Sequence, residues 1–209
     1  MTAFLRAVSF LLIVAVVVAV AAVYSIARRG VSTRSEPSGV EQLLARSVRR
    51  LATPGAVRAM RNPVEPAPDV LDQGLEHFAD HCAICHANDG SGDTEIGRSL
   101  YPRAPDMRLA ATQELSDGEL FSIIENGIRL TGMPAWGAGT PEGERASWAL
   151  VHFLRRLPGL TEEEIGRMEE LNPKTAEEWR EGEEIRRFLE GEDVEPAPAP
   201  SHKHEGSRH

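Results

Sequence analysis

Two cysteines and one histidine stand close enough together in this chain to hold a single cofactor, in the segment Cys82-Ala83-Ile84-Cys85-His86. The spacing C-x-x-C-H is the pattern of c-type haem attachment. Two thiols on one short turn can each add to a vinyl group of the same porphyrin. The histidine that follows is then held against the iron as the proximal ligand. The sequence therefore predicts one covalent haem c, attached to Cys82 and Cys85 and ligated by His86.

Two other uses of a cysteine pair fit the sequence less well. A thioredoxin-like C-x-x-C lies in a βαβ setting, and nothing near Cys82 has the pattern of a strand. A structural zinc site takes four ligands, commonly from two separated pairs, whereas Cys82 and Cys85 are the only cysteines in the chain. A single local pair also excludes a disulfide-rich secreted scaffold.

The sixth position of the iron needs a second ligand, and the chain contains five methionines. Met133 stands in Thr131-Gly132-Met133-Pro134-Ala135-Trp136, a loop by its Gly and Pro, between two helical stretches. Methionines more often fill a hydrophobic core, but the loop favours Met133 as a ligand. Met107, after Pro105 and Asp106, is the second choice. A His/Met pair is the usual ligation of cytochromes c.

The elements that must position this site have helical signatures. Leu150, Phe153, Leu154 and Leu157 are spaced as one apolar stripe of a helix. Gly74 lies inside another helical stretch, where it costs about 1 kcal/mol against Ala and so indicates a close helix contact. A capping box of Ser116 and Glu119 predicts a third helix over residues 116–126.

These features together resemble a class I cytochrome c domain of the bacterial monohaem kind, over residues 69–158. Besides the haem motif and the Met133 loop, the segments that support the resemblance are Gly74 and Phe78, residues 88–93, residues 124–129, and Trp148, Leu150 and Phe153. The resemblance implies an all-α fold with a partly exposed haem edge. It also implies that Gly74 and Phe78 meet Leu150 and Phe153 where the first and last helices of the domain cross.

The resemblance implies further cofactor-binding residues. A proline near the proximal histidine is expected to fix the imidazole through its backbone carbonyl, and we favour Pro105 over Pro102. Arg103 and Trp136 are candidates for hydrogen bonds to the haem propionates. Each of these two is also interpretable as an ordinary surface or packing residue, and that is the interpretation we favour.

The N-terminal segment 1–28 is predicted to be a transmembrane anchor. Residues 7–27 contain no charge, and as a helix they reach about 30 Å, the thickness of a bilayer core. A cleaved signal peptide ending near Ala19-Val20-Ala21 is the alternative. Arg28 and Arg29 would place this end in the cytoplasm by the positive-inside rule. The resemblance instead implies haem attachment outside, so we expect a bacterial inner-membrane anchor with the haem domain in the periplasm.

Charge divides the chain into a basic and an acidic part. Residues 1–62 contain nine basic and two acidic side chains, a net +7, and the remainder contains 14 basic and 30 acidic, a net −16. This acidic body excludes nucleic-acid binding, which needs clustered Lys and Arg. Residues 29–68 are predicted to be a linker with a short amphipathic helix from Gly39 to Leu51, then a Pro-rich strap. Its arginines either touch anionic lipid headgroups or are solvated, and we favour the second.

Two segments follow the domain. Residues 159–191 are predicted to be an acidic helical extension of two helices, starting at Thr161 and Thr175. It is either solvated or docks a basic partner, and we favour the first. Residues 192–209 are predicted to be a disordered tail. Its histidines are compatible with weak copper or zinc binding or with no ligand, and we favour no ligand; they are His202, His204 and His209.

The expected function is electron transfer by one haem c that cycles between Fe(II) and Fe(III), without catalysis of its own. The expected partners are membrane-associated respiratory or dehydrogenase proteins, reached through the N-terminal helix. An accessory subunit of a larger oxidoreductase complex is the alternative. A peroxidase or gas-reactive enzyme is less favoured, because it needs an open iron position and Met133 is expected to close it.

Overall fold

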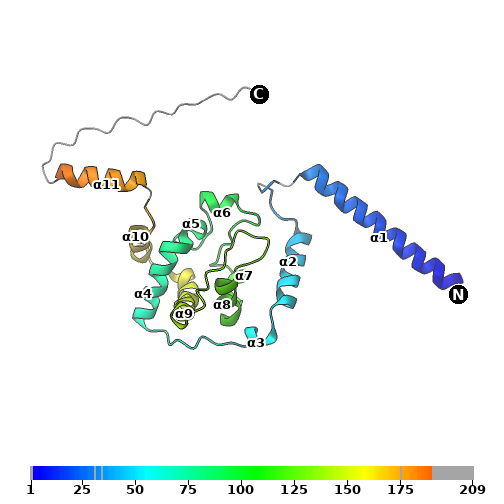
Figure 1. Ribbon diagram of the computed structural model, residues 1–209, viewed down its shortest axis with the longest axis horizontal. Coiled ribbons are helices and arrows are strands. Elements are labelled where there is room, and N and C mark those ends of the chain that lie inside the picture. Colours follow the sequence, from blue (N-terminus) through cyan, green and yellow to red (C-terminus); the bar gives the residue numbers. More distant parts are fainter. Residues whose placement is uncertain (1, 31, 34, 175, 190–209) are drawn as a thin grey trace, which may run out of the picture. The chain divides into compact units, whose positions relative to one another are not determined.

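The computed structural model describes residues 2–30, 32–33, 35–174 and 176–189, and Figure 1 shows its elements in order. These residues form helices and loops without a strand, which confirms the predicted all-α class. The helices are α1 (Thr2–Arg29), α2 (Gly39–Ala52), α3 (Gly55–Arg58), α4 (Pro68–His77), η1 (Phe78–Cys82), α5 (Ala83–His86), α6 (Glu95–Ser99), α7 (Ala110–Gln113), α8 (Asp117–Asn126), α9 (Pro141–Arg156), η2 (Leu157–Gly159), α10 (Glu162–Leu171) and α11 (Ala176–Leu189).

The crossing of α4 and α9 is the centre of the hydrophobic core. A Cβ added at Gly74 would lie 2.7 Å from the carbonyl oxygen of Ala149 and 2.8 Å from Cβ of Phe153. The missing side chain therefore lets the two helices approach closely. One turn further on, the rings of Phe78 and Phe153 are 5.2 Å apart and tilted, and both side chains are fully buried. This is the helix contact that the sequence predicted.

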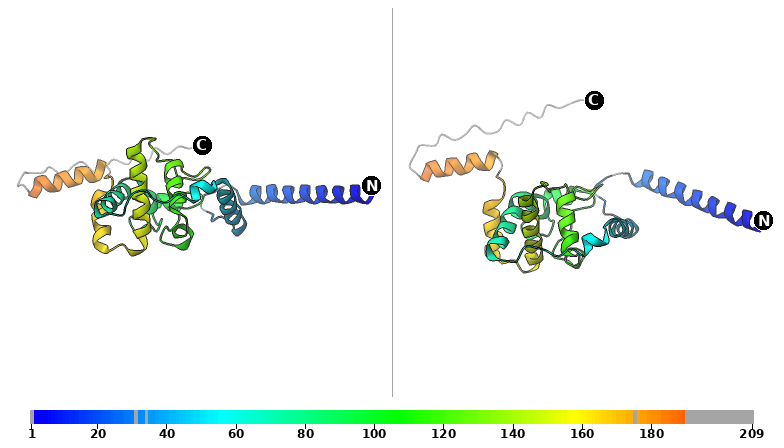
Figure 2. Two further views of the ribbon diagram at one scale, coloured as in Figure 1. Left: turned by 90° about the horizontal axis from the view of Figure 1, so that it is seen from below. Right: turned by 60° about the horizontal axis from the view of Figure 1, so that its bottom comes forward.

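Helix α10 packs against α4 and η1 (Figure 2). Met168 is fully buried in the core, and Arg167 donates to Asp72 at 2.7 Å and to Glu76 at 3.1 Å. The chain divides into two compact units, residues 1–172 and 173–209. Residues 159–191 were predicted to form one acidic extension. In the structure its first helix, α10, packs on the hydrophobic core, and its second, α11, belongs to the other unit. The predicted start at Thr175 lies outside the described residues.

Capping boxes start three of the helices. Ser116 and Glu119 cap α8 as predicted. Thr161 and Glu164 cap α10, and Ser38 and Glu41 cap α2. In each box the two side chains satisfy backbone N–H groups that have no partner inside the helix. The helix starts are therefore encoded locally.

The Pro-rich strap lies along α9. The side-chain amide of Asn62 donates to the carbonyl oxygen of Trp148 at 2.8 Å. The ring nitrogen Nε2 of His152 lies 2.6 Å from the carbonyl oxygen of Val64. These bonds satisfy strap and helix groups that are partly withdrawn from water, so the strap is a fixed part of the domain.

Helix α1 is the one described helix long and apolar enough to cross a membrane. Its segment Phe4–Ser25 has a mean hydropathy of 2.8, and its side chains are exposed in the structure. A signal sequence has the same length and composition.

We expect Gly74→Ala to destabilise the domain. The added methyl group meets backbone of α9, which gives way at a cost of up to about 3 kcal/mol, and the roughly 1 kcal/mol gain in helix propensity offsets only part of that cost. Urea denaturation of the haem-loaded protein measures the free energy of unfolding. Gly166→Ala in α10 is the matched control, because no atom lies within 4 Å of its added Cβ. It should be neutral or slightly stabilising, and equal effects of both variants would contradict the close contact.

Candidate functional site

The cysteine–histidine motif lies where α4 runs into two short helical turns. The π-helix η1 ends at Cys82, and α5 continues to His86. Such wide turns inside helices are frequent at functional sites. Cys82 and Cys85 are both free thiols and partly buried. The motif therefore presents two thiols and one imidazole from consecutive turns.

Burial changes the chemistry of the two thiols. It raises the pKa of Cys82 to about 12, with the neighbouring Cys85 as a smaller cause, and it raises the pKa of Cys85 as well. Both groups are therefore protonated at neutral pH in the folded chain without its cofactor. Cysteines of disulfide oxidoreductases instead have a lowered pKa that provides a thiolate. The environment thus disfavours thiol–disulfide exchange at this motif.

The imidazole of His86 is held close to Pro105. Burial lowers the pKa of the ring, and the backbone carbonyl of Pro105 acts against this by raising it. The buried Nδ1 atom nevertheless has no hydrogen bond of good geometry among the described residues. The carbonyl of Pro105 thus lies near enough to affect the pKa of the ring, without a hydrogen bond to Nδ1 in the described structure. Partners of metal-bound histidines act on the ring nitrogen that does not bind the metal, and Pro105 lies beside this ring.

Thr94 and Gly97, which no sequence pattern marked as site residues, contact the backbone of Cys85. The hydroxyl of Thr94 donates to the carbonyl oxygen of Cys85 at 3.2 Å, and it also caps α6 by accepting from Gly97 at 2.8 Å. A Cβ at Gly97 would collide with that same carbonyl oxygen. The chain reverses at Ala87, which has φ 59°. The sequence around Thr94 is typical of a helix start, so the cap of α6 was predictable. The contact of Thr94 with Cys85 was not predictable, because it depends on how α6 folds back onto α5.

The loop with Met133 is anchored at both of its ends. The amide N–H of Met133 donates to the hydroxyl of Thr131 at 3.1 Å, and the carbonyl oxygen of Met133 accepts from the amide of Ile128 at 3.1 Å. The amide of Trp136 donates to the carbonyl oxygen of Ile124 in α8 at 2.9 Å. These bonds fix the backbone on both sides of Met133.

The two candidate methionines differ in environment. Met107 is 7% exposed and belongs to the core cluster, and its backbone is tied to Gly90 and Gln113. Met133 is half-buried on its loop, outside that cluster. Met107 thus has the surroundings of a packing residue, whereas the Met133 side chain is not committed to the core.

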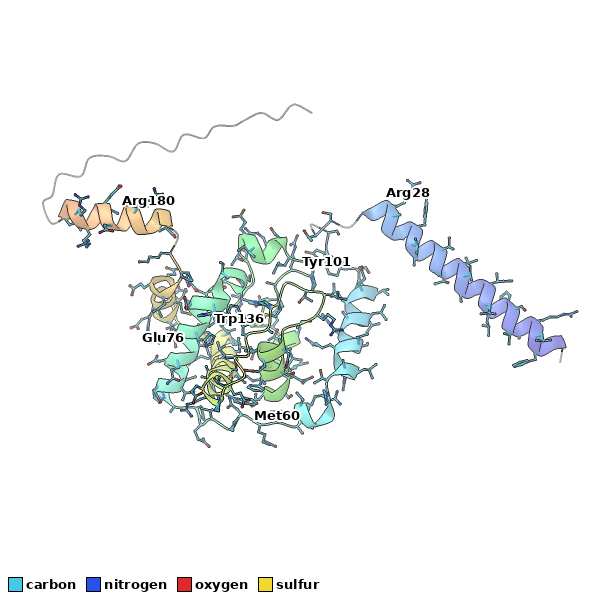
Figure 3. The ribbon with its side chains drawn as sticks, viewed as in Figure 1. Arg28, Met60, Glu76, Tyr101, Trp136 and Arg180 are labelled. Carbon is cyan, nitrogen blue, oxygen red and sulfur yellow. The ribbon has the colours of Figure 1, made fainter. Side chains whose placement is uncertain are left out.

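Trp136 links the methionine loop to the motif. Its ring, labelled in Figure 3, packs edge-on against His81. The ring centroids are 5.2 Å apart at 77°. His81 immediately precedes Cys82, and its Nδ1 lies 2.9 Å from a carboxylate oxygen of Asp80. This contact is packing of the kind we favoured for Trp136, and it brings the loop beside η1.

Arg103 and its neighbour Tyr101 face the linker. Arg103 pairs with Glu36 at 3.3 Å. The hydroxyl of Tyr101, which Figure 3 labels near α2, donates to Glu41 of that helix at 3.2 Å. Arg103 therefore has a surface partner in this structure, as expected for the surface role that we favoured.

The donor set fits a covalently attached haem. Two free thiols and an imidazole come from consecutive turns, and a thioether comes from a separate, anchored loop. Residues 69–154 match the family model described as "Cytochrome C oxidase, cbb3-type, subunit III". The matched region extends from α4 to nearly the end of α9 and includes the cysteine pair, His86 and both candidate methionines.

Proposed function

Because residues 69–154 form a class I c-type cytochrome domain, we propose that this chain passes single electrons through one haem c and transforms no substrate of its own. The observation that supports this most directly is the placement of Cys82, Cys85 and His86 on consecutive turns inside the matched region. The haem, when bound, supplies a one-electron Fe(II)/Fe(III) couple. The chain supplies the attachment, the ligands and the surrounding dielectric.

In this proposal Cys82 and Cys85 hold the haem covalently and His86 ligates the iron through Nε2. Pro105 acts on the opposite ring nitrogen, as partners of metal-bound histidines commonly do. A hydrogen bond from Nδ1 to its carbonyl would fix the ring orientation and make His86 a stronger donor. Thr94 donates to the carbonyl oxygen of Cys85, and Gly97 packs against the same carbonyl; both contacts fix the backbone of the motif.

Met133 is the proposed second axial ligand. Its backbone is fixed on both sides, and its side chain lies outside the core cluster. His/Met ligation raises the reduction potential and closes the iron to small ligands. We propose no ligand role for Met107.

A role as a haem subunit of a larger oxidoreductase is the second candidate. The family model is described by an oxidase subunit, which favours a chain that works beside membrane-bound redox proteins. Extraction of native membranes in mild detergent, followed by purification on this chain, tests this candidate. Co-elution of other redox subunits in fixed proportion supports it, and elution alone supports an independent carrier.

For location, we propose that α1 anchors the chain in the bacterial inner membrane and that the haem domain is periplasmic. The length and apolar surface of α1 support the anchor. The Arg pair at its C-terminal end favours the opposite orientation. We override this because covalent haem attachment of this type takes place outside the cytoplasm.

Carbon monoxide distinguishes the carrier from a gas-reactive enzyme. The reduced full chain should not bind CO at neutral pH, and the oxidised chain should show a sulfur-to-iron charge-transfer band at the red end of the visible spectrum. Rapid CO binding by the unmodified chain, together with absence of that band, would overturn the proposal in favour of an enzyme with an open iron site.

Gly127 provides a test of the methionine loop that leaves Met133 in place. Gly127 has φ 63°, and a Cβ there would lie 2.7 Å from the carbonyl oxygen of Met133 and 2.6 Å from the backbone carbon of Pro134. We expect Gly127→Ala to displace the loop, to weaken the charge-transfer band and to admit CO to part of the reduced protein.

Gly139→Ala is the matched control for this variant. Gly139 has nearly the same φ, 67°, but its added Cβ has no atom within 4 Å. Both substitutions place a side chain at positive φ, which L residues disfavour, but only the one at Gly127 meets the backbone of Met133 and Pro134, so only Gly127→Ala should alter the spectrum. If both variants keep the full band, the backbone at Gly127 does not control the ligand.

A further inference from the structure

Helix α2 exposes an apolar stripe that is interrupted by Ser47, whose hydroxyl donates to the carbonyl oxygen of Leu43. Five aliphatic side chains share one face of this 14-residue helix, with exposed fractions from 58% to 87%. They are Val40, Leu43, Leu44, Val48 and Leu51. Their spacing covers an arc of about 140° at 100° per residue, which is the width of a face that a globular protein buries. No residue of α2 is buried in the described structure, so this face is a surface for a partner.

The helix is nevertheless well defined. Ser38 and Glu41 form its capping box, and Thr53 closes its end by donating to Arg49. Glu41, beside the stripe and not within it, also accepts from the hydroxyl of Tyr101 in the cytochrome domain. The exposed stripe therefore belongs to a formed helix whose acidic side is attached to the domain.

Positive charge borders the stripe on one side. Residues 39–61 contain five Arg and one Glu. Helical spacing places Arg46 and Arg50 along one border of the stripe, next to Leu43. Arg58 donates to the carbonyl oxygen of Arg50 at 2.7 Å, and both arginines line an open hollow of about 430 Å³ with Ser47 and Leu51. An apolar face bordered by arginines is complementary to an anionic lipid surface, where the headgroups are negative and the acyl chains apolar.

The position of α2 in the chain points to the same partner. Nine residues, 30–38, separate it from α1, and even fully extended they span only about 30 Å. If α1 is an anchor, α2 stays close to the membrane surface whichever way the anchor is oriented. The apolar stripe then meets the bilayer before it meets any soluble partner.

We propose that α2 lies in the surface of an anionic bilayer, with its apolar stripe among the acyl chains and with Arg46 and Arg50 at the headgroups. The contact of Glu41 with Tyr101 and the pair of Glu36 with Arg103 then connect this helix to the loop that leads to Pro105. The helix thereby orients the cytochrome domain on the membrane. The proposal is independent of the axial ligands of the haem, but its proximity step depends on the proposed anchor.

Cysteine accessibility tests the proposal in the full, haem-loaded chain inserted in lipid nanodiscs. Leu44→Cys places a thiol in the stripe, and Gln42→Cys places one on the opposite face. In discs of phosphatidylcholine and phosphatidylglycerol, a water-soluble maleimide should label position 44 at least about tenfold more slowly than position 42.

Replacing Arg46 and Arg50 by Gln should reduce this protection by roughly fivefold per arginine, and discs of phosphatidylcholine alone should also reduce it. The chain without an introduced cysteine is the control for Cys82 and Cys85. Maleimide labelling of this control indicates that haem attachment has failed, and this failure is thereby distinguished from failure of the surface proposal.

Several results would overturn the surface proposal. Equal labelling of positions 42 and 44 in the anionic discs means that the stripe does not enter the bilayer. Protection of position 44 only in discs with two copies, with cross-linking between the introduced cysteines, means that a second copy covers the stripe. If the mature chain lacks α1, flotation with vesicles of the same two compositions replaces the discs, and failure to float with the anionic vesicles overturns the proposal.

Discussion

Met133→Ala is expected to abolish the sulfur-to-iron charge-transfer band and to let the reduced protein bind CO. Met133 is half-buried on a loop whose backbone is fixed by Thr131 and Ile128, so its removal takes away the proposed ligand and little core packing. The iron would then have an open sixth position. Optical spectra of the oxidised and the CO-treated reduced protein measure both effects.

Met107→Leu is the control for this prediction. Met107 belongs to the buried core, and a volume-conserving change there should cost less than about 1.5 kcal/mol of unfolding free energy. It should leave the band and the resistance to CO unchanged. Persistence of the band in Met133→Ala and its loss in Met107→Leu would exchange the roles of the two methionines.

The second large effect is expected from the cysteine pair. The double variant Cys82→Ser and Cys85→Ser should contain no haem after denaturation, because a serine hydroxyl does not form the thioether that retains the porphyrin. Haem staining of a denaturing gel, compared with the amount of protein on the same gel, measures this. The readout does not require the variant to be folded.

Single cysteine variants make this result interpretable. Each of Cys82→Ser and Cys85→Ser should retain some covalent haem through the remaining thiol, with a spectrum shifted by the free vinyl group. His81→Ala, immediately before Cys82, removes the contact with Trp136 but no attachment atom, so full covalent haem is expected there. Haem bound to the double variant on a denaturing gel would show that other residues form the linkage.

The haem motif could be predicted because its chemistry is local. Cys82, Cys85 and His86 lie within five residues, and any helical turn brings them together. The family match supports the same part of the chain. The resemblance also pointed to Pro105, whose carbonyl raises the pKa of the His86 ring; its role toward a haem stays a prediction. Thr94 and Gly97 were missed, because their roles depend on where α6 folds back onto α5.

The helical class and several helix boundaries were also readable, for the same reason. Capping boxes at Ser116 and Thr161 use bonds over three residues, and the contact of Gly74 with α9 was indicated by a glycine that a helix otherwise disfavours. The placement of α10 was not readable. Its few apolar residues suggested a solvated helix, but Met168 is fully buried against the core.

The sequence by itself thus determined which residues can bind a haem and where the helices begin, because both depend on neighbours in the chain. Only the tertiary structure decided which methionine is packed in the core and which remains available, since burial depends on residues far away in sequence. It also decided that the apolar face of α2 stays exposed while that of α10 is covered. Periodicity shows that a helix has a face to bury, and the three-dimensional arrangement determines what covers it.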